Sequence, residues 1–219
     1  GYETLRVRNP RLVYGAIRGF GDPRPGESPY DDWPAYDVVA QAMGGLVGTT
    51  GPSGSSGTTA GPSIGDIFPG TLAALGVVSA VHRAKATGQG QFVDVAMYDA
   101  IVALCENVVY QYSFEGRVLS PTGYGHQALC PFDVFETADG AVAIAAPTPN
   151  HWAILCALID RVDLIDDPRT FENIARVGHR DLVTEAISSW TRSRTKAEVV
   201  AERGGRVPVG PVNTAADIF

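Results

Sequence analysis

The sequence is poor in cysteine and histidine, and neither residue type forms a pattern. Its three cysteines, Cys105, Cys130 and Cys156, are widely spaced and contain no CxxC pair. An odd, scattered set is typical of reduced thiols rather than of a disulfide scaffold, so we expect a cytoplasmic protein. The four histidines show no metal-ligand spacing with a third ligand. We therefore predict no metal site.

Excess basic charge and long apolar runs are also lacking. Lysine and arginine number 17 against 24 acidic residues, for a formal net charge of −7. A general nucleic-acid binder carries a basic surface, so we predict no nucleic-acid partner. No uninterrupted apolar run approaches the roughly 20 residues that span a bilayer. The first residues also lack a basic segment followed by an apolar one, so we predict neither a membrane partner nor a signal peptide.

What is present is an ordinary globular composition, 45% apolar over 219 residues, with ample material for a core. Up to Gly116 the pattern alternates between strands and helices, which favours an α/β fold with a parallel sheet. Beyond it a hairpin precedes several helices, which is typical of an α+β domain. We predict a large domain over residues 1–116, and a linker with a small domain over residues 117–219. The expected strands and helices are 11–17, 37–46, 69–85, 91–97 and 98–113 in the first part, and 132–135, 141–146, 150–159, 180–189 and a helix from 196 in the second.

Asp66 is the most informative residue, because it lies where a Gly/Ser/Thr-rich stretch meets a helical apolar pattern. Unpaired backbone N–H groups and the positive end of the helix dipole favour a carboxylate at such a junction. One interpretation is an N-cap, a position that aspartate prefers. The other is a reactive carboxylate exposed in a cleft. Both can hold, and the local sequence leaves the choice open.

An ordered series of motifs runs along the chain: Asn9–Tyr14, Gly19–Gly21, Tyr36–Leu46, Gly65–Asp66, Arg83 with Thr87–Met97, Thr137–Gly140, Trp152 and Val207–Val212. This series resembles the class III coenzyme A transferases, the CaiB/BaiF-type family, over nearly the whole chain. The segment Thr87–Met97, joined to the helix after Asp66, is its most specific part. The resemblance implies a Rossmann-like large domain, here partial, a smaller α+β domain and an interlocked homodimer. It also implies that the chain is a fragment without the family's two terminal segments.

The resemblance implies that Asp66 is the catalytic nucleophile of an acyl-CoA:carboxylate CoA-transferase. Its carboxylate would attack an acyl-CoA thioester to give a mixed anhydride, and the released thiolate would then form an aspartyl-CoA thioester. A carboxylic acid acceptor would reverse these steps and leave as its CoA ester. The expected partners are therefore an acyl-CoA and an acid, with coenzyme A as substrate and no permanently bound cofactor.

A glycine-bearing loop is the candidate cover for the nucleophile. Relatives close such a loop over the reactive intermediates, and an ordinary interdomain turn is the alternative interpretation. Its residues here are Gly123, Tyr124, Gly125, His126 and Gln127.

Tyr36 and Asp37 bear on the type of reaction. Racemases of the family carry a histidine at the position that Tyr36 occupies, and tyrosine is a poor base near neutral pH. This favours CoA transfer over epimerisation. Asp37 is either a helix cap or a residue that lines the site. Two alternatives stay open, a racemase that uses Asp66 with another acid/base partner and a non-catalytic CoA-binding subunit.

Overall fold

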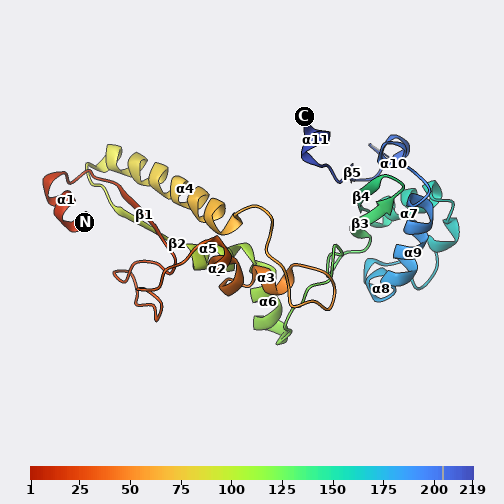
Figure 1. Ribbon diagram of the computed structural model, residues 1–219, viewed down its shortest axis with the longest axis horizontal. Coiled ribbons are helices and arrows are strands. Elements are labelled where there is room, and N and C mark those ends of the chain that lie inside the picture. The colour runs from red at the N-terminus through yellow and green to blue at the C-terminus, as the bar shows by residue number, and fades with distance from the viewer. Residues whose placement is uncertain (204) are drawn as a thin grey trace. The chain divides into compact units, whose positions relative to one another are not determined.

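The computed structural model describes residues 1–203 and 205–219 and divides into two compact units, Gly1–Gly123 and Tyr124–Phe219 (Figure 1). Both contain helices and strands, and among the described residues only the first unit contains a parallel strand pair. The expected α/β fold class with a smaller α+β part is confirmed. The domain boundary between residues 116 and 117 stays a prediction.

The first unit is built on the parallel pair β1 and β2, in which Tyr14 lies opposite Phe92 and Arg18 opposite Ala96. Parallel neighbours need a crossover connection, and the long helix α4 supplies it beside the two strands (Figure 1). The elements are α1 (Tyr2–Arg8), β1 (Tyr14–Arg18), α2 (Asp37–Met43), α3 (Leu46–Thr49), α4 (Ile64–Thr87), β2 (Phe92–Ala96), α5 (Met97–Leu104) and α6 (Glu106–Glu115).

Small residues let α4 lie close to the strands. Ala73, Ala80 and Ala84 are buried on one side of the helix. A Cβ at Gly76 would come within 2.8 Å of a Val93 methyl group. Real Cβ contacts are essentially never this short, so the sequence places its smallest residue where helix and strand meet most closely.

The opposite side of α4 is apolar and exposed. The helix has 24 residues, and an 18-residue window of it has a mean hydropathy of 1.6 with 22% of that window buried. By length and composition it could cross a membrane, although the sequence shows no uninterrupted apolar run, because isolated polar residues divide it. Leu75 and Val78 are 65% and 68% exposed. Length and composition alone do not place this helix in a membrane.

Two helices expected to be continuous are each divided. The expected helix over residues 37–46 ends at Met43, because Gly45 adopts a φ of +93°, and the short α3 follows. The expected helix over residues 98–113 is interrupted at Cys105, whose ψ of +35° separates α5 from α6. Ala40 of α2 packs against Ile101 and Cys105 in a small apolar cluster.

The N-terminal helix α1 was not expected, and aromatic and ionic contacts hold it against the strands. Tyr2 packs on Phe92 with ring centroids 5.5 Å apart, and the Arg24 guanidinium lies 3.9 Å from the Phe92 centroid. Arg24 also binds the buried Asp22 carboxylate through two nitrogens, at 2.6 and 2.8 Å. This hydrogen bonding holds the pKa of Asp22 well below its usual range.

The second unit is an antiparallel sheet in the order β3-β4-β5, covered by helices. Phe132 lies opposite Ala145 and Thr137 opposite Gly140, so the expected hairpin is confirmed. The short β5 and α8 were not expected. The elements are β3 (Phe132–Thr137), β4 (Gly140–Ala145), α7 (Pro149–Leu158), η1 (Val162–Leu164), α8 (Asn173–Gly178), α9 (Arg180–Thr191), α10 (Lys196–Arg203), β5 (Val209–Pro211) and α11 (Ala215–Ile218).

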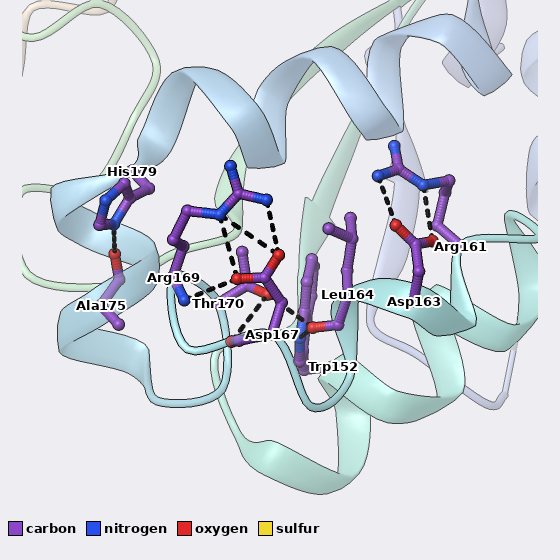
Figure 2. A network of polar contacts seen from close by, with 9 residues as sticks. All are labelled: Trp152, Arg161, Asp163, Leu164, Asp167, Arg169, Thr170, Ala175 and His179. Atoms are coloured by element: carbon purple, nitrogen blue, oxygen red, sulfur yellow. Dashed lines mark hydrogen bonds and ion pairs between the residues drawn. The ribbon is translucent and has the colours of Figure 1, made fainter.

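One face of this sheet forms the core of the second unit with the helices. Phe135, Val142 and Ile144 point inward and pack in one cluster with Trp152 of α7. The Trp152 indole N–H donates to the Leu164 carbonyl at 3.2 Å, as Figure 2 shows. A buried indole needs such a partner, so η1 fixes the orientation of the ring.

Arg176 of α8 is fully buried in the second unit, and its partners are carbonyl groups. Desolvation lowers the pKa of its guanidinium, which also lies 5.1 Å from the Trp152 ring centroid. No ion pair involving Arg176 is found among residues 1–203 and 205–219. Backbone oxygens therefore compensate the buried charge. The acceptors are the carbonyls of Cys130, Pro147, Thr170 and Phe171.

We expect the Asp167–Arg169 pair to make the second unit sensitive to acid (Figure 2). The Arg169 side chain and backbone N–H bind the Asp167 carboxylate and lower its pKa to about 2, against about 3.9 for an unperturbed aspartate. A lowered folded-state pKa contributes stability that is present above pH ~4 and is lost as the pH falls toward 2. The difference in unfolding free energy between the wild type and Asp167→Asn should therefore shrink over that interval. Urea unfolding at several pH values measures it, and a constant difference would contradict the role of this pair.

Candidate active site

Asp66 lies within the first turn of α4 rather than before it. The helix begins at Ile64 after the N-cap residue Ser63, whose side chain makes no capping bond. The N–H groups of Asp66 and Ile67 donate to the Ser63 carbonyl at 3.0 and 2.9 Å. The N-cap interpretation of Asp66 is therefore wrong, and its side chain is exposed.

Proline explains why the start of α4 was placed too late. Pro69 was expected to open the helix, but it lies inside α4 and is buried. Pro69 removes the hydrogen bond to the Gly65 carbonyl and places its ring against that carbonyl, but it leaves the N–H groups of the preceding turn unaffected. The preceding turn can therefore form, and it carries Asp66.

Asp37 supplies the cap that Ser63 lacks, from another helix. Tyr36 is the N-cap residue of α2, so Asp37 is the first helical residue and does not cap its own helix. Its Oδ1 accepts the Gly65 N–H at 2.7 Å. The carboxylate thus satisfies one of the unpaired N–H groups of the first turn of α4, next to Asp66.

Gly65 allows this contact because it has no side chain. A Cβ at this position would lie 2.6 Å from the Asp37 carbonyl oxygen and 2.8 Å from its Oδ1. Both distances are shorter than real Cβ contacts. The backbone before Asp66 therefore lies directly against α2.

Gln41 completes the network, and the sequence reasoning did not identify it. Its side chain is fully buried, and Nε2 donates to both carboxylate oxygens of Asp37, at 2.9 and 2.8 Å. Its Oε1 accepts the Ala60 N–H at 2.9 Å. The only sequence signal is the spacing of four residues between Asp37 and Gln41 on one helix face.

The Gly/Ser/Thr-rich stretch before α4 is anchored by hydrogen bonds. Besides the Ala60 bond to Gln41, the Thr58 N–H donates to the Thr50 carbonyl at 2.7 Å. Gly51 accepts a hydrogen bond from the Gly123 N–H at 3.0 Å. Gly123 adopts a φ of +75°, which a residue with a side chain rarely does.

Tyr36 and Tyr124 are the exposed aromatic residues among the expected site residues, each within its own unit. Tyr36 is 79% exposed at the start of α2. Tyr124 is 76% exposed in the second unit, where it lines a pocket of about 340 Å³ with Phe132, Val134 and Ala143. Neither side chain is part of a core.

The rest of the expected cover loop belongs to the second unit. Gly125 lies against the Arg180–Asp133 pair, because a Cβ there would come within 2.9 Å of both side chains. The His126 N–H donates to the Phe132 carbonyl, and Arg180 donates to the His126 carbonyl at 2.6 Å. Gln127 follows in the same unit.

The cysteines are unsuited to be nucleophiles. Cys105, Cys130 and Cys156 are buried, and burial raises the pKa of all three thiols, to about 12 for Cys156. Because the thiolate is the reactive form, these groups stay unreactive near neutral pH. The exposed carboxylate of Asp66, on a turn held by Asp37, is the better candidate for attack on an electrophilic carbon.

Comparison with known proteins places the whole chain in one group. The model of CoA-transferase family III matches residues 1–219. The chain is 45% identical over 219 residues to the succinyl-CoA:mesaconate CoA-transferase of Haloarcula hispanica, covering all of this chain and 55% of that protein. It is 33% identical to the succinate–glutarate CoA-transferase of Agrobacterium fabrum, covering all of this chain and 54% of that protein.

A solved structure agrees with the sequence relatives. A CaiB/BaiF family protein from Brucella suis superposes with a TM-score of 0.82 at 31% identity, covering all of this chain and 57% of the other. The chain thus spans about half the length of the relatives that it matches.

Proposed function

This chain belongs to CoA-transferase family III, and from that premise we propose that its full-length protein transfers coenzyme A from an acyl-CoA to a carboxylic acid. Asp66 is the proposed nucleophile. The observation that carries the proposal is the exposed Asp66 carboxylate on the first turn of α4. The hydrogen bond from the Gly65 N–H to the Asp37 carboxylate holds this turn in place.

The names of the relatives support a dicarboxylate substrate class. The protein at 45% identity is named for succinyl-CoA and mesaconate, and the one at 33% for succinate and glutarate. We therefore propose succinyl-CoA as the donor and a short dicarboxylic acid as the acceptor.

The first half of the proposed reaction moves CoA onto the protein. An Asp66 carboxylate oxygen attacks the thioester carbonyl carbon, the C–S bond breaks, and the CoA thiolate leaves behind a mixed anhydride of Asp66 and succinate. The thiolate then attacks the Asp66 carbonyl carbon and releases succinate. An aspartyl-CoA thioester remains, so the energy of the thioester bond is conserved.

The second half repeats these steps with the acceptor. A carboxylate oxygen of the acceptor attacks the Asp66 carbonyl carbon and displaces the thiolate, which forms an anhydride of Asp66 and the acceptor. The thiolate attacks the acyl carbon of the acceptor, and Asp66 leaves as a carboxylate. No atom is oxidised or reduced, and water must be excluded because it would hydrolyse both intermediates.

Backbone N–H groups are the proposed stabilisers of the oxyanions that form at each attack. Glycine lets backbone approach a substrate closely, and preorganised donors at such an oxygen contribute strongly to catalysis. Because the Gly123 and His126 N–H groups already donate to the Gly51 and Phe132 carbonyls, the role that we propose for the loop from Gly123 to Gln127 is to exclude water from the intermediates.

A direct assay of the full-length protein tests this function. With succinyl-CoA and mesaconate, we expect mesaconyl-CoA and succinate as products, and a CoA adduct on the peptide that contains Asp66 by mass spectrometry. Omitting the acceptor should leave the adduct and stop product formation. Loss of an α-deuteron from an acyl-CoA without CoA exchange would instead support a racemase, and binding of CoA without either reaction would support a non-catalytic subunit.

A further inference from the structure

Gln41 has a buried side chain, and both the nitrogen and the oxygen of its amide form hydrogen bonds within the site. It is 0% exposed, and its amide nitrogen donates to both oxygens of the Asp37 carboxylate. Its amide oxygen accepts the Ala60 N–H. A buried amide with partners on both ends has one orientation, because turning it over would place its oxygen against the carboxylate.

This orientation fixes the Asp37 carboxylate in turn. A carboxylate at the start of a helix can rotate about its side-chain torsions. Here Gln41 engages both oxygens, while Oδ1 also accepts the Gly65 N–H at 2.7 Å. The carboxylate is therefore held in the position that caps α4.

The fixed position of the Asp37 carboxylate affects Asp66 through the backbone of Gly65. Gly65 lies so close to Asp37 that a Cβ would come within 2.8 Å of Oδ1, and Asp66 is the next residue. Because the direction of the first turn sets where the Asp66 side chain points, a shift at Gly65 moves the carboxylate. Displacing a reacting group by about 1 Å can lower a rate on the order of 100-fold.

We propose that Gln41 is a positioning residue for Asp66, which acts through Asp37 and Gly65 and ties the loop at Ala60 to the reactive turn. This inference rests on the proposed function of Asp66. It goes further, because it assigns a role in the reaction to a buried amide that does not touch the substrate.

A purely structural role for Gln41 predicts a different result from a positioning role. If Gln41 only stabilised the packing of α2, its loss would lower the folded fraction and leave the folded molecules with normal rates. If it positions Asp66, the rate of the chemical step falls while substrate binding is retained. The two roles therefore separate in a comparison of kcat with KM.

The test uses Gln41→Met in the full-length protein, because methionine has a similar length and no hydrogen-bonding amide. We expect the rate of CoA-adduct formation on Asp66 from succinyl-CoA to fall about 10- to 100-fold, with a KM for succinyl-CoA within about twofold of the wild type. Ile101→Val is the matched control, because Ile101 is also fully buried and packs in the cluster that joins α2 to α5. It should lose some thermal stability and keep the wild-type rate.

A double-mutant cycle adds a second measurement, the coupling between two variants in the rate of adduct formation, which a change in protein stability does not affect. Asp37→Asn and Gln41→Met are combined, and the rate of adduct formation is measured at saturating succinyl-CoA. Because both residues act through the same contact with Gly65, the double variant should be little slower than the slower single variant. Independent effects would multiply instead.

The outcomes separate this inference from the proposed function. If the wild type forms no CoA adduct on Asp66, the proposed function fails. If the wild type forms it and folded Gln41→Met forms it at the same rate, the function stands and the role of Gln41 is overturned. Multiplying effects in the double variant would also overturn it.

Discussion

Asp66→Ala in the full-length protein is expected to abolish CoA exchange, with a fall in kcat on the order of 10⁴-fold or more. The methyl group of alanine cannot attack a thioester, so neither the anhydride nor the aspartyl-CoA thioester can form. Mesaconyl-CoA production from succinyl-CoA, followed by chromatography, measures the loss. Binding of CoA, measured by calorimetry, should change little, because the substitution removes an exposed side chain.

Asp99→Ala is the matched control for this experiment. Asp99 is also an exposed aspartate in the first turn of a helix, α5, but it lacks the contact that fixes the turn of α4. We expect it to retain the wild-type rate. An Asp66→Ala protein that still exchanged CoA at a comparable rate would refute the assignment of the nucleophile.

Arg176→Met is expected to lower the unfolding free energy by about 3 kcal/mol or more, a larger loss of stability than we expect for the other variants described above. Each buried carbonyl left without a donor costs roughly 1–3 kcal/mol, and four carbonyls bind this guanidinium. Methionine fills similar length but donates no hydrogen bond. Urea unfolding of the full-length protein, with fluorescence of the neighbouring Trp152, measures the change in midpoint.

Arg161→Met provides the comparison at the surface. The Arg161 side chain pairs with Asp163 at 2.8 Å and both partners are partly exposed, so we expect a change of about 0.5 kcal/mol or less. Equal midpoints for the two variants would show that water replaces the bonds of Arg176 without cost. In that case the buried guanidinium is not what holds the chain around Cys130 and Thr170.

The elements predictable from sequence are those whose pattern is local. The hairpin around Ala138–Gly140 and the strand ending at Ala96 carry their own turn and apolar signals. The breaks at Gly45 and Cys105 were not predicted, because a glycine allows a positive φ without requiring it and Cys105 carries no helix-breaking signal. The short strand β5 exists only because β4 is present to pair with it.

The candidate site likewise has some features that the sequence predicts and others that depend on tertiary contacts. The junction of a polar stretch with a helix drew attention to Asp66, and the family resemblance implied its role as nucleophile. The start of that helix differed because Pro69 is accommodated inside it. The bond between Asp37 and Gly65 joins residues from two helices, and no spacing rule predicts it. Gln41 looked like an ordinary helical residue, because nothing in the sequence indicates that it would be buried against a carboxylate.

The bond between Asp37 and Gly65 has a consequence for how the chain acquires its reactive geometry. Most hydrogen bonds of α4 are local and can form early, whereas this one must wait until α2 and α4 have met. A partly folded chain can therefore show full helical circular dichroism while the turn that carries Asp66 is still fraying. Spectroscopic helix content is then a poor guide to competence, and slowed hydrogen exchange at the Gly65 amide is the signature of a molecule whose carboxylate is ready to react.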